Sequence, residues 1–341
     1  MNDLKHKILK AVEADLRAIE TALVDHLNPC FELVRRIAGH ILFAGGKRLR
    51  PLLMVQTARL CGYAGDEAAK YAVLFEYLHT ATLLHDDLVD GGRQRRGTTA
   101  AHRQWNPPKA VLTGDFLLAR ALSLAAETRS LDVIDTIAAI TEQMSQGEIE
   151  QLARIGDLTL DEDQYLELIR LKTAVLFQGV CRTGALLSSA PAKQVRALEE
   201  YGHHLGMAFQ MADDLLDYTS DSEALGKKTG TDLREGKLTL PIIYALRRGS
   251  RDELHRDELH RDELHRDELQ WMVGLIRARE FTSGQFQRLI KLLDNCGAID
   301  YTRRSAQTHV DEAIDAIRFF DEGDSKELLV DIARYALTRT A

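Results

Sequence analysis

Proline and paired cysteine are scarce in this chain, and long apolar runs are absent. The 341 residues include 6 prolines and 4 cysteines, and the cysteines at positions 30, 61, 181 and 296 form no Cys-x-x-Cys pair. Scattered cysteines behind no secretory signal are typical of the reducing cytoplasm, so we expect a cytoplasmic protein. No apolar run approaches the ~20 residues that cross a bilayer, so no transmembrane segment is predicted, although peripheral membrane contact stays open.

Positive charge is also in short supply. Lys and Arg number 44 against 52 Asp and Glu, which gives a formal net charge of -8. A protein that holds nucleic acid on a basic face needs the opposite balance, so no nucleic-acid partner is expected. The sequence contains no P-loop, no G-x-G-x-x-G, no G-x-S-x-G and no H-E-x-x-H. The common nucleotide cradles, serine hydrolases and zinc peptidases are therefore disfavoured.

Helical periodicity runs through almost the whole chain. Apolar residues recur at three- and four-residue spacing, and short breaks marked by Gly or Pro separate the periodic segments. We therefore predict an all-α protein, a single large helical bundle that forms one domain over residues 1–341. The expected helices cover residues 3–24, 28–42, 50–61, 66–90, 108–127, 130–153, 161–188, 193–219 and 237–248, with several more after 270.

One segment breaks this pattern. Residues 251–270 repeat an Arg-Asp-Glu-Leu unit four times at five-residue spacing. A step of five residues advances about 140° around a helix, so the leucines form no common stripe. The same spacing separates His255, His260 and His265 and argues against a metal site there. We interpret the segment as a repetitive surface insertion without an assigned function.

The sequence Asp-Asp-x-x-Asp occurs twice. The first copy holds Asp86, Asp87 and Asp90, and the second holds Asp213, Asp214 and Asp217. In each copy the first and last carboxylates share a helix face, where like charges repel. A solvated acidic face is the plain alternative, but both copies lie in strongly apolar helices, and buried carboxylates need partners. Oxygen ligands favour Mg²⁺, so the two copies predict a magnesium site.

Cationic clusters follow or precede both acidic motifs. A glycine-opened turn carries Lys47, Arg48 and Arg50, and further cations stand at Arg93, Arg95, Arg96, Lys172, Lys227, Lys228 and Lys237. Each cluster alone is typical of surface charge. Together with the carboxylates they suit a polyanion, because Mg²⁺ can bridge carboxylate to diphosphate while Arg and Lys bind the remaining oxygens. A site of this kind between apolar helices suits departure of diphosphate from a carbocation.

Eight motifs in order resemble a known family, the trans-prenyltransferases or polyprenyl diphosphate synthases. They are GGKRLRP (45–51), HTATLLHDDLVD (79–90), RRG (95–97), VLTGDFLLARA (111–121), QGE (146–148), KTAVLF (172–177), FQMADDLLDY (209–218) and GKKTGTDLREGKLTLP (226–241). The resemblance implies an isoprenoid synthase fold around a central cavity, usually in a homodimer. It implies head-to-tail 1'-4 condensation of isopentenyl diphosphate with an allylic prenyl diphosphate, in which the departing diphosphate takes the released proton.

The resemblance also implies a role for each matching residue. Asp86, Asp87, Asp90, Asp213, Asp214 and Asp217 would hold three Mg²⁺ and the allylic diphosphate, with Asp86, Asp87, Asp90, Asp213 and Asp217 as the metal ligands. The same diphosphate would be assisted by Arg95, Lys172, Thr173, Gln210, Lys227 and Lys237, among which Lys172 is counted as catalytic. Isopentenyl diphosphate would be bound by Lys47, Arg50, His79 and Arg96. Without the resemblance, a core histidine is the favoured interpretation of His79. Gly91-Gly92-Arg93-Gln94 departs from the family pattern and puts that loop's conformation in question.

Product length is expected to depend on the helix before the first motif. Ala81 and Thr82 stand five and four residues before Asp86, where short-chain members of the family carry an aromatic residue. Their small size predicts an open apolar tunnel along Leu78 and Leu74 and a long product of about C35–C50 for quinone side chains, with octaprenyl diphosphate as the central expectation. The alternatives are a farnesyl or geranylgeranyl diphosphate synthase, a non-catalytic partner subunit, a terpene cyclase and an acidic helical scaffold.

Overall fold

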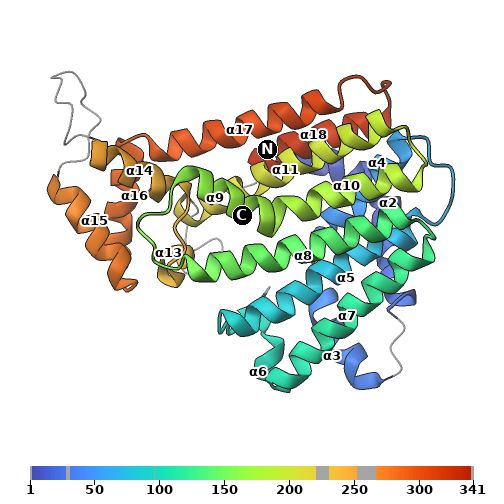
Figure 1. Cartoon of the computed structure of the whole chain (residues 1–341), viewed down its shortest axis with the longest axis horizontal. Helices are drawn as coiled ribbons and strands as arrows, with labels where there is room; N and C mark the ends of the chain where they lie inside the picture. The colour runs from blue at the N-terminus through green and yellow to red at the C-terminus, as the bar shows by residue number, and fades with distance from the viewer. Residues whose placement is uncertain (1, 28–30, 96, 220–229, 252–265, 339–341) are drawn as a thin grey trace.

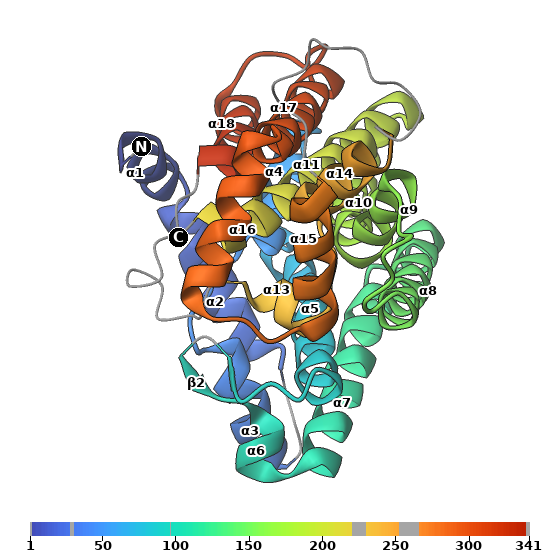
Figure 2. The same ribbon diagram turned by 90° about the vertical axis from the view of Figure 1, so that its left-hand side faces the viewer.

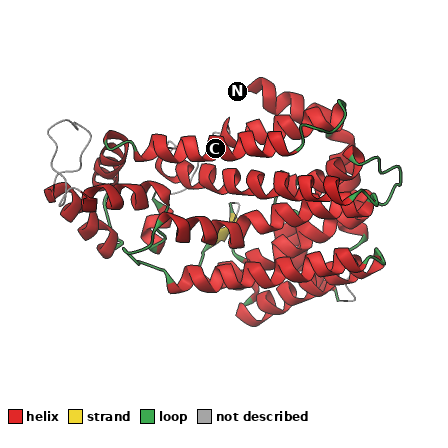
Figure 3. Cartoon of the chain, turned by 45° about the horizontal axis from the view of Figure 1, so that its top comes forward, coloured by secondary structure: helices red, strands yellow, loops and turns green. Residues whose placement is uncertain are grey.

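Helices make up nearly all of the regular structure in this computed structural model, which describes residues 2–27, 31–95, 97–219, 230–251 and 266–338. The all-α prediction is therefore confirmed (Figure 3). The helices are α1 (Asn2–Ala11), α2 (Glu13–Asp25), α3 (Glu32–Leu42), α4 (Leu49–Leu60), α5 (Ala68–Val89), α6 (Ala101–Trp105), α7 (Pro107–Glu127), α8 (Leu131–Ala153), α9 (Glu162–Ile169), η1 (Arg170–Ala174), α10 (Val175–Leu187), α11 (Ala192–Thr219), α13 (Thr231–Glu235), α14 (Leu240–Arg251), α15 (Arg266–Ala278), α16 (Ser283–Asn295), α17 (Ala298–Ala316) and α18 (Asp324–Thr338).

The predicted helix boundaries agree with these elements to within a few residues, with one exception. The segment expected as a single helix over 3–24 is two helices, α1 and α2, separated at the buried Val12. Four short elements were not predicted, namely α6, α13 and the antiparallel strands β1 (Gln94–Arg95) and β2 (Thr98–Thr99). Of the repetitive insertion, residues 252–265 lie outside the described part, and Arg266–Gln270 open α15.

The long helices α8, α10, α11 and α17 run side by side across the molecule, with α14, α15 and α16 gathered at one end (Figure 1). Figure 2 looks along these long helices, with α5 and α13 near the middle of the view. Two apolar clusters fill the interior. One joins α2, α4, α5, α7 and α10, the other joins α9 with α14 to α17, and α11 contributes to both. The helix that carries the second acidic motif is therefore anchored in both parts of the core.

Capping explains where several helices begin. Asp161 accepts a hydrogen bond from the backbone N–H of Gln164, whose side chain accepts one from the N–H of Asp161, so a capping box opens α9. Thr282 and Gln285 open α16 in the same way. Asn106 caps α7 directly before Pro107, a residue that suits the first helical turn.

Two glycines permit close approaches that shape the site. A side chain at Gly147 of α8 would put Cβ 2.8 Å from Cβ of Leu171 and 3.0 Å from the backbone nitrogen of Lys172. Gly230 has φ +76, and a Cβ there would lie 2.6 Å from the ring of Phe286. Gly147 thus lets α8 pack onto η1, and Gly230 lets the chain turn tightly into α13.

Candidate active site

The first acidic motif occupies the C-terminal end of α5. Asp86 lies in the last turn and is half-buried, Asp90 caps the helix, and Gly91 leaves it with φ +65. Asp87 is buried and is turned toward β1, where Nε of Arg95 donates to its Oδ1 at 2.8 Å. Its Oδ2 is buried with no hydrogen-bond partner among the described residues. The three aspartates therefore meet different surroundings, and Asp87 is held by Arg95.

The second acidic motif lies near the C-terminal end of α11 and is held by a chain of hydrogen bonds. Asp214 is buried and accepts from the Tyr165 hydroxyl at 2.6 Å and from Nε2 of Gln210 at 2.8 Å. The amide oxygen of Gln210 in turn accepts from the Thr173 hydroxyl at 2.7 Å. Gln210 and Thr173, both predicted as site residues, are thus brought together beside Asp214, while Asp213 is exposed on the same helix.

Asp217 binds the N-terminal end of α13. Its carboxylate accepts hydrogen bonds from the backbone N–H groups of Gly230, Thr231 and Asp232, at 3.0, 3.1 and 3.1 Å. Carboxylates stabilise such a helix start because the first N–H groups there lack partners within the helix. The contact brings α13, and with it Lys237, against the end of α11.

Lys172 lies in a π-helical turn. The segment η1 interrupts an otherwise continuous α9–α10, and turns of this kind often mark functional sites. Nζ of Lys172 lies 2.6 Å from a carboxylate oxygen of Glu148 and donates to the Gln151 amide oxygen at 2.6 Å. Glu148 was not predicted as a site residue, although it belongs to the QGE motif. Its Oε1 is buried and has no hydrogen-bond partner in the described part of the chain.

Lys237 connects the two acidic motifs. Its Nζ lies 3.3 Å from the Asp90 carboxylate, at the end of α5, and donates to Glu235 at 2.8 Å. Burial alone would lower the pKa of Lys237, but Glu235, Asp90 and Asp232 raise it overall, so the side chain is cationic. Lys237 follows the second motif in sequence, yet its ammonium group contacts Asp90 of the first motif, 147 positions earlier.

Burial opposes the ionised form of three of the carboxylates of the two motifs. Burial, together with Glu148 and Asp90, raises the pKa of Asp86 from 3.8 to about 6. Burial, opposed by hydrogen bonds from Tyr165 and Gln210, raises the pKa of Asp214 to about 6. Burial also raises the pKa of Asp217. Desolvated carboxylates that repel one another favour a bound cation.

The donor atoms fit Mg²⁺. They are carboxylate oxygens with no imidazole or thiolate among them, the set that hard divalent cations prefer. The buried oxygens of Asp87 and Glu148 that lack partners among the described residues, and the raised pKa values of Asp86 and Asp214, point the same way. The residues present therefore fit the predicted magnesium site.

The cationic side chains in and after the turn before α4 differ in burial and in their partners. Lys47 is exposed, with its Nζ 5.9 Å from the Tyr335 ring centroid, and the Arg50 guanidinium lies 5.0 Å from the Phe177 ring centroid. Arg48 is instead buried, in the left-handed conformation, and donates to Glu20 at 2.6 Å and to Glu76 at 2.8 Å. Arg48 therefore has a structural role, which leaves Lys47 and Arg50 as the candidates to face a ligand.

The remaining predicted residues are placed as follows. His79 is half-buried on α5, Ala81 is buried and Thr82 is half-buried one turn before Asp86. Leu78 and Leu74, expected to line an apolar tunnel, are buried in the core. Arg96 and Lys227 lie outside the described residues. Sequence reasoning missed Tyr165, which carries no motif, and Asp232, whose pKa is raised by burial and by Asp214 and Asp217.

Comparison with known proteins identifies the class to which this fold and site belong. The family model described as Polyprenyl synthetase matches residues 31–276, and the chain belongs to this family of prenyltransferases. Octaprenyl diphosphate synthase of Escherichia coli (strain K12) is 33% identical over 336 residues, which cover 98% of either chain. The all-trans-nonaprenyl-diphosphate synthase (geranyl-diphosphate specific) of Rhodobacter capsulatus is 36% identical over 340 residues, 99% of this chain and 98% of the relative.

A solved structure agrees over nearly the whole length. The polyprenyl synthase of Caulobacter crescentus CB15, complexed with calcium and isoprenyl diphosphate, has a TM-score of 0.88 and 39% identity, with 98% of each chain covered. The fold class and the enzyme class predicted from the motifs are thereby confirmed. Within the described residues, no helix is long and apolar enough to span a membrane.

Proposed function

We propose that this protein condenses isopentenyl diphosphate head-to-tail with an allylic prenyl diphosphate, in a Mg²⁺-dependent reaction that makes a long-chain trans-polyprenyl diphosphate. The observation that carries the proposal is the contact of Lys237 with Asp90, because it joins the segment after the second acidic motif to the first motif. The two motifs can then act on one diphosphate. The names of the Escherichia coli and Rhodobacter capsulatus relatives support a product in the octaprenyl to nonaprenyl range.

Under this proposal, Asp86, Asp87, Asp90, Asp213 and Asp217 hold the Mg²⁺ ions, three in number by family resemblance. Bound there, Mg²⁺ would neutralise the charge of the leaving diphosphate. Lys172, held by Glu148 and Gln151, and Lys237, held by Glu235, place ammonium groups beside the carboxylates. Arg95, Thr173, Gln210 and Lys227 assist the same diphosphate. The two ammonium groups would offset the negative charge that develops on the diphosphate oxygens as the bond breaks.

Isopentenyl diphosphate is assigned to Lys47, Arg50, His79 and Arg96. Lys47 and Arg50 lie on either side of the buried Arg48, whose ion pairs with Glu20 and Glu76 hold the turn in place. The exposed Lys47 can reach a diphosphate at little cost in desolvation. A terpene cyclase would need no second diphosphate pocket, so these cations favour a prenyltransferase that uses two substrates.

The product is proposed to be about C35–C50, with octaprenyl diphosphate at the centre of the range and quinone side chains as its use. Ala81 and Thr82 support this assignment, because both side chains are small where short-chain members of the family carry an aromatic residue. A short-chain product is the alternative, since the Short chain isoprenyl diphosphate synthase of Methanothermobacter thermautotrophicus is also 32% identical over 312 residues. The two alternatives differ in where elongation stops.

A non-catalytic partner subunit is the other alternative. The Heptaprenyl diphosphate synthase component 2 of Geobacillus stearothermophilus, whose name describes one component of a synthase, is 38% identical over 232 residues. Both acidic motifs are complete in the present chain, which favours an active enzyme. We propose that residues 1–341 form one domain and that two copies of the chain form a homodimer. We also propose a cytoplasmic location, which the free thiols of Cys61, Cys181 and Cys296 support.

The test is incorporation of labelled isopentenyl diphosphate into an allylic primer by the purified full chain. With Mg²⁺ the label enters the organic-soluble product, and with EDTA incorporation falls to background and returns when Mg²⁺ is restored. Sedimentation of the same sample reports the oligomeric state. Absence of incorporation with every allylic primer in Mg²⁺ would favour the partner-subunit alternative.

A further inference from the structure

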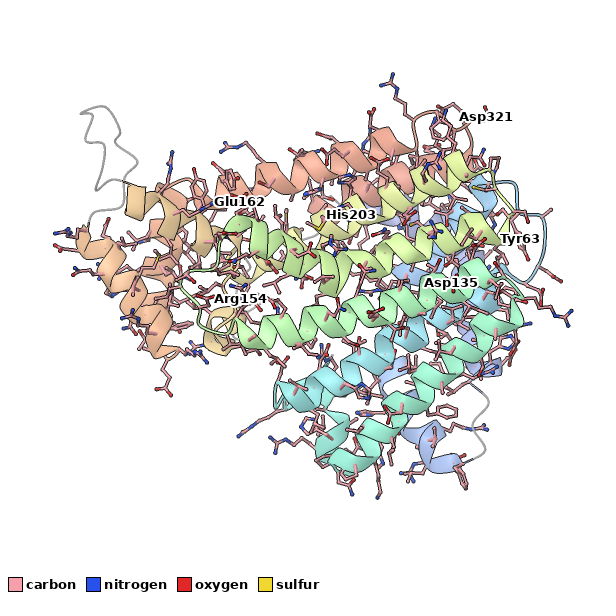
Figure 4. The ribbon with its side chains drawn as sticks, viewed as in Figure 1. Tyr63, Asp135, Arg154, Glu162, His203 and Asp321 are labelled. Carbon is pink, nitrogen blue, oxygen red and sulfur yellow. The ribbon has the colours of Figure 1, made fainter. Side chains whose placement is uncertain are left out.

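Two histidines and a glutamate meet where α11 packs against α17. His204 comes from α11, and His309 and Glu312 come from neighbouring turns of α17. Figure 1 shows the two helices side by side, and Figure 4 labels His203, the residue next to His204, on α11. Nδ1 of His204 lies 2.8 Å from Nδ1 of His309 and 3.0 Å from Oε2 of Glu312. Nδ1 of His309 lies 3.6 Å from the same Oε2.

These three distances match the edges of a small metal coordination sphere. Zn²⁺ binds His nitrogen and carboxylate oxygen at about 2.0–2.2 Å, and neighbouring ligands of a tetrahedron are then roughly 3.3 Å apart. The observed separations of 2.8, 3.0 and 3.6 Å lie on both sides of that value. The three ligand atoms are therefore close enough to one another to share one ion.

The chemistry of the donors suits a transition metal. The His309 side chain is 19% exposed at the helix contact, and its Nδ1 faces Nδ1 of His204. Glu312, whose side chain is 50% exposed, can supply the negative charge. Two imidazoles and one carboxylate favour Zn²⁺, whereas Mg²⁺ prefers oxygen ligands and water.

We propose that His204, His309 and Glu312 form a second cation site that takes Zn²⁺, distinct in ligand chemistry from the carboxylates of the two acidic motifs. The proposal does not rest on the prenyltransferase activity. His204 precedes Asp213 by nine residues, which is about 13 Å along a helix. A cation here would therefore tie α17 to the helix that carries the second motif, as a structural clamp away from the reacting atoms.

The site can be tested by Zn²⁺ binding to the full chain, stripped of metal with EDTA and then kept in excess Mg²⁺ so that the acidic motifs are occupied. We expect one equivalent of Zn²⁺ to bind, and His309→Gln and His204→Gln each to weaken binding at least about tenfold. His6→Gln, which changes an exposed histidine of α1, is the matched control and should bind as the unaltered chain does.

Two further readouts separate a real site from a folding defect. Zn²⁺ should raise the Tm of the unaltered chain and of His6→Gln but leave that of His309→Gln unchanged, because only a chain that binds the ion is stabilised by it. Co²⁺ in the same site should give the visible absorption of tetrahedral coordination, which oxygen-only octahedral sites lack. If the unaltered chain and a folded His309→Gln bind Zn²⁺ equally, the three residues are only a hydrogen-bonded group and the proposal is wrong.

Discussion

The ammonium of Lys237 lies 3.3 Å from the Asp90 carboxylate and joins the segment after the second acidic motif to the end of α5. Asp217 supports this contact by accepting three backbone N–H groups at the start of α13. The short helix α13 thus brings the two motifs together. We propose that catalysis by both motifs depends on this contact, because it lets the two motifs face one diphosphate.

Replacing Lys237 directly tests its contact with Asp90. Lys237→Gln removes the cation that Asp90 and Glu235 hold in place, and a lost charge-stabilising donor typically lowers kcat about 10²- to 10³-fold. We expect a loss in this range, with a raised KM for the allylic substrate, in steady-state assays. Lys291→Gln, on the exposed face of α16, is the matched control. Equal activity of the two variants would remove Lys237 from the site.

We predict that Asp86 is needed for activity but lowers the free energy of unfolding when no metal is bound. Its pKa rises from 3.8 to about 6 on folding, so folding takes up a proton between these pH values. The stability that this group contributes is present below pH 3.8 and is lost as pH rises through about 6. Asp86→Asn should therefore raise the free energy of unfolding in EDTA at about pH 7.5 by about 1 kcal/mol.

The same variant should lose prenyl transfer. Denaturant unfolding in EDTA, compared at about pH 7.5 and about pH 4, measures the first effect, and the gain over the unaltered chain should shrink at the lower pH. An elongation assay in Mg²⁺ measures the second. An acidic scaffold without a catalytic role would show the gain in stability and no change in activity.

Lys47 and Arg48 are neighbours with opposite expected behaviour. Arg48→Met leaves Glu20 and the buried Glu76 without their cation, and breaking a buried ion pair costs about 3–5 kcal/mol. Lys47→Met removes an exposed side chain and should leave Tm nearly unchanged while it raises KM for isopentenyl diphosphate. Thermal unfolding and steady-state kinetics of the two variants separate the roles. Similar losses of Tm in both would show that Lys47 is structural.

We predict that a larger side chain at position 82 shortens the prenyl product. It lies half-buried one helical turn before Asp86, and its hydroxyl is already satisfied by the His79 carbonyl at 2.8 Å. Thr82→Phe should block the growing chain, because the phenyl ring is much larger than the threonine side chain. The products should shorten to about C15–C20, as measured by chromatography of the dephosphorylated alcohols. Leu131→Phe adds an aromatic ring at a position that is 77% exposed and should leave the product unchanged. An unshifted distribution in Thr82→Phe would place the growing chain elsewhere.

The sequence predicted most of the helices because their signals are local. The apolar spacing and the glycines at positions 91 and 92 placed a helix over 66–90, and α5 spans Ala68–Val89. The paired acidic motifs also indicated which helices carry the candidate site. In each case the pattern that predicts the element lies within the element or directly beside it.

Contacts between distant helices were beyond such reasoning. Tyr165 reaches Asp214 only because α9 packs beside α11, and no motif marks it. Asp217 was predicted as a metal ligand, yet in this structure it also binds the start of α13, a helix too short to show periodicity. Arg48 resembled its cationic neighbours in sequence, and only its burial beside Glu20 and Glu76 separates it from them.

The most direct test of the central claim is chain-length analysis of the product that the purified chain makes from farnesyl diphosphate and excess isopentenyl diphosphate in Mg²⁺. We predict elongation to about C35–C50, centred on the octaprenyl product, and no elongation in EDTA. A product that stops at C20 would contradict the assigned chain length. Failure to extend any allylic primer in Mg²⁺ would contradict the assignment of the two acidic motifs to catalysis.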